Sequence, residues 1–386
     1  MSNSQRDLAN QAADAIERSS PHIKALVGFD GFIDSIIHIV DQRRSMSPDD
    51  YDRIATIPEF AARCAAASGK SANLEMVVQD VRFGGNGPLL SGALGSLGMS
   101  VTYIGAVGEM DDWGKLDPIY APFAQRCERV IPICPPGLTD AMEFDDGKIM
   151  LGKPAHVQEV SWERIKSVVG LDALVEMFDQ ATLISVVNWT LVGGVGGIWE
   201  GMCREIFPKL SPNSARRIFI DLSDPAKRND GDVGRALGQI QELQQHLPVT
   251  LGLNLAESKR IASVLGVQVY QDVDQPLAGS VPDAASCIRE AMGISCVVIH
   301  QHSGAGAADE HGESCWFAGP YTKQPRISTG AGDHFGGGFS FAQCGGLGLG
   351  ACLAVACGVA GVYVRDAESP SKDRLVEFLR DLPDPE

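Results

Sequence analysis

Short apolar runs alternate with longer amphipathic segments through most of the chain. A continuous apolar run bounded by turn-forming residues is typical of a strand that is buried on both faces. We expect such strands at residues 25–29, 101–104, 183–187, 217–221, 249–253 and 296–300. Helical spacing of apolar residues predicts helices at residues 88–97, 162–178, 233–246, 257–265 and 282–292. The alternation indicates an α/β fold of three layers, with helices on both faces of a mostly parallel central sheet.

Two stretches interrupt this alternation, at about residues 35–83 and 130–153. Their patterns predict a helix at residues 51–67, a strand at residues 76–83, and a hairpin of residues 139–144 and 148–151 turned by Asp145-Asp146-Gly147. Two excursions that both carry strands can pair into a second sheet. We therefore expect one domain over residues 1–386, in which the excursions form a small β-rich lid above the ligand crevice.

Composition and charge restrict the partners of the chain. It has 386 residues, of which 44% are hydrophobic, and a formal net charge of −17 at pH 7. This charge argues against nucleic acid or an anionic membrane as a partner, although a local glycine loop can still bind phosphate. An apolar stretch at residues 347–364 is interrupted by glycines, and we interpret it as a buried helix, with no membrane span.

The N-terminal residues and the cysteines indicate a cytoplasmic protein. Residues 1–20 predict an amphipathic helix and contain no apolar segment of the kind that a signal peptide needs. None of the ten cysteines forms a C-x-x-C pair. Most of them stand among apolar or small residues, which favours buried free thiols in a reducing compartment.

The turn Gly330-Ala331-Gly332-Asp333 opens a helix of small and apolar residues. Backbone N–H groups at the start of a helix can bind an anion, and glycines let the backbone approach that anion closely. A carboxylate beside an anion site is electrostatically unfavourable unless it has a chemical task. We expect Asp333 to take a proton from a hydroxyl while the N–H groups hold a phosphoryl group.

Asn254 and Glu257 follow the predicted strand at residues 249–253. Open α/β sheets bind ligands at the carboxyl ends of their strands, so Glu257 is a candidate to hold Mg²⁺ directly or through water. A helix cap explains the same two residues, because Asn254 at the N-cap and Glu257 three residues later form the pattern of a capping box.

Two further motifs also follow predicted strands. Gly84-Gly85-Asn86 opens a helix, and such a start suits a polyhydroxyl or anionic ligand. Asp30 and Asp34 follow the first strand, where a carboxylate can accept hydrogen bonds from two sugar hydroxyls. Turn formation around Asp30-Gly31 explains that segment equally well.

The order of these motifs resembles the ribokinase (PfkB-type) carbohydrate kinase family, from about residue 24 to about residue 380. The C-terminal signature of that family contains G-A-G-D, like Gly330 to Asp333, and its N-terminal signature contains a double glycine, like Gly84-Gly85. The N-x-x-E motif of the family is similar to Asn254 through Glu257. Its acid after the first strand is similar to Asp34, with Asp30 as a second candidate.

This resemblance implies a ribokinase-like fold and a phosphotransferase that moves the terminal phosphate of ATP to a hydroxyl of a sugar or sugar-like molecule. It assigns Asp333 as the general base, and it assigns the stabilisation of the transferred phosphoryl group to the N–H groups of Gly330, Ala331 and Gly332. The implied sugar contacts are Asp34, Asp30, Gly84, Gly85 and Asn86. The implied nucleotide contacts are Asn254, Glu257, His300 and Gly304, with Glu257 also at the Mg²⁺ ion.

Departures from the family pattern keep other functions open. The histidine-bearing loop at residues 300–304 and the spacing from Gly28 to Asp34 allow an ADP-dependent sugar kinase, and a nucleoside or vitamin kinase is a further alternative. The residues before Gly330 lack the acid that the family usually has there, which allows a non-catalytic sugar-binding regulatory protein. The sequence leaves open a homodimer and a requirement for a monovalent cation.

Overall fold

A nine-stranded sheet forms the centre of the computed structural model, which describes residues 2–18, 23–272 and 274–386. Its strands, in spatial order, are β14 (Ser314–Ala318), β13 (Gly304–Asp309), β12 (Cys296–Gln301), β11 (Val249–Asn254), β10 (Arg217–Asp221), β9 (Leu183–Val187), β1 (Lys24–Phe29), β5 (Ser100–Gly105) and β6 (Arg129–Pro132). From β12 to β6 all neighbours are parallel, whereas β13 and β14 pair antiparallel. The six strands expected from the apolar runs are confirmed.

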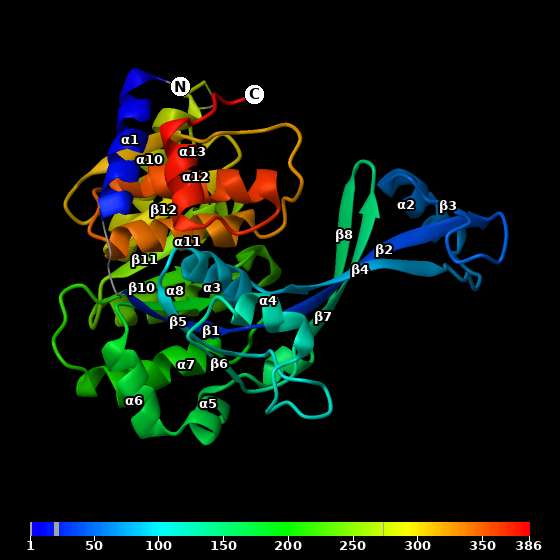
Figure 1. Ribbon diagram of the computed structural model, residues 1–386, viewed down its shortest axis with the longest axis horizontal. Coiled ribbons are helices and arrows are strands. Elements are labelled where there is room, and N and C mark those ends of the chain that lie inside the picture. Colours follow the sequence, from blue (N-terminus) through cyan, green and yellow to red (C-terminus); the bar gives the residue numbers. More distant parts are fainter. Residues whose placement is uncertain (1, 19–22, 273) are drawn as a thin grey trace.

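Helices cover both faces of this sheet, as Figure 1 shows. One face packs against α5 (Trp162–Val169), α6 (Leu171–Gln180), α7 (Val195–Gly201), α8 (Asp230–Gln244), α9 (Leu255–Leu265) and α10 (Leu277–Met292). The other face packs against α1 (Asn3–Arg18), α3 (Asn86–Ser96), α4 (Ala121–Ala124), α11 (Ala331–Cys344), α12 (Leu349–Asp366) and α13 (Lys372–Arg380). Adjacent strand residues alternate between the two faces: Leu26 contributes to one apolar core and Val27 to the other.

The ends of the chain lie on one side of the body. Helix α1 confirms the amphipathic N-terminal pattern, and positions 19 and 20 of that expected segment lie outside the described residues. Helix α12 is the one described helix whose length and apolarity are sufficient to cross a membrane, and 67% of it is buried inside the protein. It packs against α11, α1 and α13, which agrees with the interpretation of residues 347–364 as a core helix.

Two corrections concern helix boundaries. The pattern at residues 162–178 predicted one helix, but Gly170 with φ of 86° separates α5 from α6, because its positive φ is incompatible with a continuous helix. The pattern at residues 51–67 also predicted one helix, and its first residues instead form strand β3 (Tyr51–Arg53). Helix α2 (Ile57–Ala66) begins only after Thr56, which forms a capping box with Glu59.

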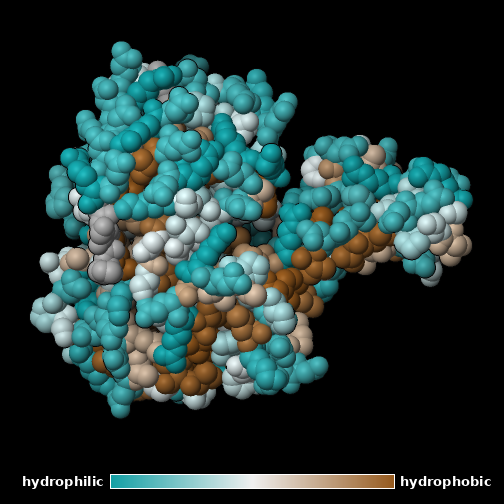
Figure 2. Space-filling model, viewed as in Figure 1, coloured by the Kyte–Doolittle hydropathy of each residue, from teal (hydrophilic) through white to brown (hydrophobic). Residues whose placement is uncertain are grey.

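A second sheet projects from the side of the body (Figure 1). Its strands are β3, β2 (Phe32–Arg43), β7 (Gly137–Phe144) and β8 (Gly147–Lys153), with β4 (Met76–Gly84) paired to β2. The predicted hairpin is confirmed as β7 and β8, and the two excursions pair as expected through β2 and β7. Helix α2 covers part of one face through a small apolar cluster that includes Ile37, Phe60 and Phe144. Figure 2 shows a hollow between this projecting sheet and the body.

Candidate active site

The turn before α11 has the geometry of an anion site. Gly330 has φ of 88°, and a side chain there would place Cβ 3.0 Å from both Leu89 Cδ1 and Tyr363 Oη. This left-handed turn ends the preceding loop and lets the helix begin at once with Ala331. Among the described residues, no hydrogen-bond acceptor is found for the N–H groups of Gly330 and Gly332. The first turn of α11 therefore presents unpaired donors beside a carboxylate.

That carboxylate belongs to Asp333, whose residue surface is 9% exposed. Its Oδ1 accepts a hydrogen bond of 2.8 Å from Nδ2 of Asn86, the first residue of α3. Burial raises the pKa of Asp333 well above its ordinary value, the negative charge of Asp221 raises it further, and the Asn86 hydrogen bond opposes both. No ion pair involves Asp333 within the described ranges. The carboxylate thus combines burial with a single side-chain donor, as a proton acceptor requires.

Asp30 lies in the short connection between β1 and β2 and is fully buried. Its Oδ2 accepts hydrogen bonds from Asn86 N and from Asn188 Nδ2, and its Oδ1 accepts one from Gly87 N. The carboxylate therefore caps the N-terminus of α3. The sequence suggested a sugar contact for Asp30, whereas these bonds direct both oxygens at the protein backbone and at Asn188.

Asp34, in β2, lines a small cavity between the projecting sheet and the body. Burial raises the pKa of its carboxyl group, and a hydrogen bond from Thr139 and the charge of Lys148 oppose this shift. Gly84 stands directly opposite, since a Cβ there would lie 2.4 Å from Asp34 Oδ2. A larger residue at position 84 would crowd the Asp34 carboxylate. Gly84 lines the same small cavity as Asp34, and its contact with a ligand stays a prediction. Gly85, with φ of 101°, then turns the chain into α3.

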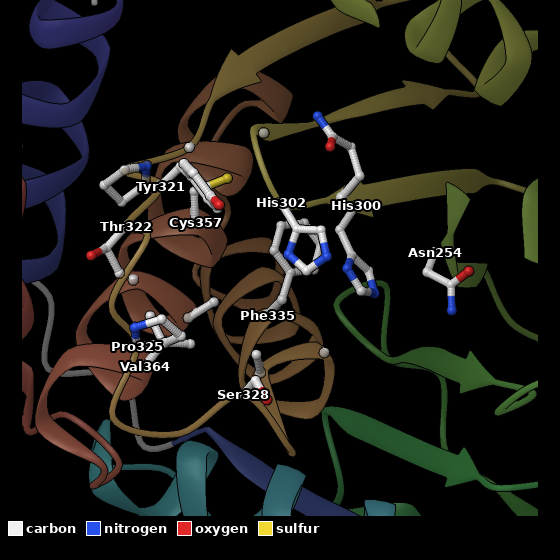
Figure 3. A pocket seen from close by; sticks show the side chains of 18 of the residues that line it. Asn254, His300, His302, Tyr321, Thr322, Pro325, Ser328, Phe335, Cys357 and Val364 are labelled. Carbon is white, nitrogen blue, oxygen red and sulfur yellow. The ribbon is translucent and has the colours of Figure 1, made fainter. Parts of the chain in front are cut away.

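A larger cavity of about 680 Å³ lies on the other side of the 328–332 loop (Figure 3). Ser328, Ala331 and Gly332 form one wall, and Asn254, His300 and Gly304 belong to others. The ring of His300 packs against Phe335 with centroids 5.0 Å apart. Burial lowers the pKa of His300 to about 4, so this ring is neutral at physiological pH. Five residues predicted to contact the nucleotide or its phosphate therefore line one cavity: Asn254, His300, Gly304, Ala331 and Gly332.

Asn254 and Glu257 form the helix cap that the sequence left open. Asn254 Oδ1 accepts from Glu257 N at 2.9 Å, and Glu257 Oε2 accepts from Asn254 N at 2.8 Å. The other oxygen, Oε1, accepts from Asp224 N at 2.8 Å. Among the described residues, no group of three or more His, Cys, Asp or Glu side chains could hold a metal ion without other ligands. The metal role of Glu257 stays a prediction, and any ion there needs phosphate or water as additional ligands.

Sequence reasoning missed two site residues. Asp221 was assigned only to the end of a strand, yet burial and then the neighbouring charge of Glu257 raise its pKa to about 7. Lys148 was assigned only to the hairpin, yet its Nζ lies 3.4 Å from Thr329 Oγ1, beside the glycine turn. The position of Asp221 at the carboxyl end of β10, next to β11, was a signal that could have identified it. No local signal marks Lys148, because its contact with residue 329 is purely tertiary.

Comparison with known proteins identifies the family. The sequence model of the prokaryotic ketohexokinase family matches residues 2–382. The ketohexokinase of Haloferax volcanii is 29% identical over 376 residues, covering 95% of each chain. Arabidopsis thaliana ribokinase, solved with ribose and ATP, superposes with a TM-score of 0.60 at 14% identity, covering 94% of this chain and 99% of the other.

A ribokinase from Cryptococcus neoformans, solved with ADP, gives the same TM-score of 0.60 at 15% identity, over 92% of this chain and 99% of that one. These structural likenesses confirm the ribokinase-like fold that the motifs implied. The family match does not favour the nucleoside-kinase, ADP-dependent or non-catalytic alternatives. The chain belongs to the prokaryotic ketohexokinase family and is a sugar kinase, an enzyme that transfers a phosphoryl group to a sugar hydroxyl.

Proposed function

We propose that this enzyme transfers the terminal phosphoryl group of ATP to a hydroxyl of a ketohexose, with Asp333 as the general base. The ketohexose is suggested by the Haloferax relative and by the family description. ATP is suggested by the ribokinase that was solved with ribose and ATP. Two cavities that share one loop support a reaction between two bound ligands.

One observation carries the proposal: the 328–332 loop is a wall common to both cavities. Ser328, Ala331 and Gly332 line the large cavity, whereas Thr329 lines the small one together with Asp34. A nucleotide in the large cavity brings its terminal phosphate to the N–H groups that open α11. A sugar in the small cavity brings a hydroxyl to the same loop. Asp333 lines neither cavity, but it directly follows Gly332 in the first turn of α11, so we expect its carboxylate to lie beside the point where the two substrates meet.

The proposed chemistry uses proton transfer and charge stabilisation. The Asp333 carboxylate accepts the proton of the attacking hydroxyl, while Asn86 holds the carboxylate in position through its 2.8 Å hydrogen bond. The N–H groups of Gly330 and Gly332, which have no acceptor among the described residues, face the phosphoryl group and stabilise the charge that develops on its oxygens. The N–H group of Ala331, which was assigned the same role from the sequence, already donates a bond of 3.3 Å to Ser328 O. Asp34 accepts hydrogen bonds from sugar hydroxyls. Asp30 acts indirectly, because it fixes the N-terminus of α3, from which Asn86 projects.

Magnesium fits this site only as an ion shared with the nucleotide. Mg²⁺ retains several water ligands and prefers one or two carboxylates together with phosphate oxygens. Asp221 ends β10, and Glu257 lies in the first turn of α9, which follows the adjacent strand β11. These neighbouring carboxylates would hold the ion through water. When bound, the ion neutralises phosphate charge. Without that neutralisation, the negative charges of this acidic site would repel the phosphates.

The substitution Asp333→Asn tests the role of the base. Asparagine has the same shape but cannot accept the proton, so kcat should fall at least about a hundredfold while the affinity for ATP changes little. Steady-state kinetics with fructose and ATP give kcat, and calorimetry gives the ATP affinity. The matched control is Asp232→Asn, because Asp232 also lies in the first turn of a helix, α8, and pairs with Arg228 away from the site. Near-normal turnover of Asp333→Asn would remove Asp333 from this role.

A substrate panel tests the rest of the proposal. Assays with ATP and with ADP as donors, against ketohexoses, aldohexoses, ribose and nucleosides, should give the highest kcat/KM for ATP with a ketohexose. A clear preference for ADP, or for a nucleoside, would contradict it.

A further inference from the structure

Two buried aromatic side chains hold the glycine turn from behind. The hydroxyl of Tyr363, in α12, donates a hydrogen bond of 2.9 Å to the carbonyl oxygen of Thr329. Nδ1 of His334, in α11, lies 2.8 Å from the carbonyl oxygen of Gly330, which also accepts from His334 N at 3.1 Å. The two rings stack on each other with centroids 3.5 Å apart and planes inclined by 15°. Consecutive carbonyls of the turn are therefore fixed by one stacked pair.

The protonation of His334 follows from its partners. The Gly330 carbonyl can only accept, so Nδ1 carries the proton and donates it. Nε2 is then the acceptor for the hydroxyl of Ser369, 2.8 Å away. His334 is only 1% exposed, and burial lowers its pKa to about 4, which keeps the ring in this neutral form at physiological pH. The ring is thus locked in orientation by a donor bond on one side and an acceptor bond on the other.

Fixing a carbonyl also fixes the next N–H group. A trans peptide is planar, and its C=O and N–H point in opposite directions. The Tyr363 bond to the Thr329 carbonyl therefore sets the direction of the Gly330 N–H, and the His334 bond to the Gly330 carbonyl sets that of the Ala331 N–H. Ala331 N also donates a longer bond, 3.3 Å, to Ser328 O, which closes the turn. The Gly330 N–H has no acceptor among the described residues and is free to bind an anion.

We propose that His334 and Tyr363 are positioning residues, which hold the N–H groups of the glycine turn in the geometry that binds the terminal phosphate of the nucleotide. This inference rests on the proposed function, since it assumes that this turn receives the phosphoryl group. Donors act on a developing charge only if they are already oriented when the reaction begins. Glycines give the turn its shape but leave it free to change, and the stacked pair removes that freedom.

The substitution Tyr363→Phe tests the proposal most sharply, because it removes one hydroxyl and keeps the stacked ring. We expect kcat to fall by about 5- to 50-fold, less than for loss of a whole oxyanion donor. The KM for fructose should change less than about twofold. The affinity for a non-hydrolysable ATP analogue should fall several-fold relative to that for ADP, because only the analogue carries the terminal phosphate. The KM readout matters because Tyr363 also lines the small cavity.

Two further variants test the histidine. Asparagine can place its side-chain amide near the position of Nδ1, so His334→Asn should retain more of kcat than His334→Leu does.

The matched control for Tyr363→Phe is Tyr120→Phe, which removes another buried hydroxyl that donates to a backbone carbonyl, that of Phe32. Tyr120→Phe should lower thermal stability about as much as Tyr363→Phe does. It should leave the ratio of ATP-analogue to ADP affinity unchanged.

The outcomes separate this inference from the function on which it rests. A raised fructose KM with normal kcat in Tyr363→Phe would overturn the inference and make Tyr363 a sugar contact. An unchanged ratio of analogue to ADP affinity would also overturn it, even if Asp333→Asn is inactive. If Asp333→Asn is fully active, the part of the proposed function that makes Asp333 the base fails, whatever Tyr363→Phe does.

Discussion

At the scale of single residues, burial and then the charge of Asp221 raise the proton affinity of Asp333. Burial raises the pKa of Asp333, and the neighbouring Asp221 raises it further. A general base must be ionised, so kcat/KM should fall as the pH drops through the pKa of Asp333. Asp221→Asn removes the like charge, which lowers that pKa. We expect the acid limb of the profile of kcat/KM against pH to move to lower pH in this variant.

Kinetics measured from about pH 5 to about pH 9 would locate the limb. The control is again Asp232→Asn, whose profile should overlay that of the wild type. A limb that moves to higher pH in Asp221→Asn would contradict the electrostatic argument. An unchanged limb would show that another group sets it.

The local geometry that the sequence indicated is found where it depends on immediate neighbours, whereas the roles of these residues stay predictions. Gly330 through Asp333 and the Asn254–Glu257 cap are contained in single turns, so spacing alone indicates their geometry. The bond from Asn86 to Asp333 joins residues 247 positions apart, and no local pattern encodes it. Asp30 illustrates the same limit. Its place after the first strand was evident, but only the fold shows that α3 and Asn188 occupy its carboxylate.

At the scale of elements, the hairpin of β7 and β8 brings a cation to the 328–332 loop. Nζ of Lys148 lies 3.3 Å from Glu143 Oε1 and 3.4 Å from Thr329 Oγ1, and its charge opposes the raised pKa of Asp34. Lys148→Met keeps the length of the side chain and removes the charge. We expect this variant to have a higher KM for fructose and a lower kcat. Their combined effect should lower kcat/KM by about tenfold.

Steady-state kinetics measure this effect, and Lys153→Met is the matched control. Lys153 is also in β8, but its ammonium group pairs with Asp140 rather than with the 329 position. Equal decreases of kcat/KM in Lys148→Met and Lys153→Met would indicate that both substitutions damage the hairpin as a whole. A normal Lys148→Met enzyme would exclude the hairpin cation from the reaction.

Elements were predictable where one pattern extended over the whole segment. The parallel strands are buried on both faces, so their apolar runs are continuous and clear. The errors occurred where a single residue, or a pairing with a distant strand, interrupts a helical pattern of apolar residues. Gly170 splits an apparent helix in two, and the residues before Thr56 pair with β2 although they continue a helical pattern. In both cases backbone conformation or tertiary pairing overrode helical periodicity.

At the scale of the whole molecule, we expect the projecting sheet to act as a lid. It joins the body at one end, where β2, β4, β7 and β8 connect to it. The cleft between the projecting sheet and the body is open in Figure 2. Closure over bound ligands excludes water, which otherwise competes with the sugar for the phosphoryl group. The radius of gyration from small-angle X-ray scattering should therefore decrease when fructose and a non-hydrolysable ATP analogue are both present. The analogue alone is the control, and identical profiles in all states would argue against closure.

The buried acids of the site also make the stability of the whole molecule depend on pH. Burial is the largest cause of the raised pKa values of Asp30, Asp221, Glu257 and Asp333, and that of Asp221 reaches about 7. In the unfolded chain, carboxyl groups have pKa values near about 4. Between these limits the folded protein binds more protons than the unfolded chain does. The free energy of unfolding must therefore decrease as the pH rises through this window.

We expect the ligand-free protein to have a lower thermal midpoint at about pH 8 than at about pH 5.5, because its buried carboxylates are ionised at the higher pH. Asp221→Asn should be more stable than the wild type at about pH 8, by roughly 1–3 kcal/mol, and should show a flatter dependence. Scanning calorimetry at the two pH values measures both effects. A midpoint that rises with pH would mean that these carboxylates find compensating partners. The expected decrease would mean instead that the fold retains destabilising charges because phosphoryl transfer requires them.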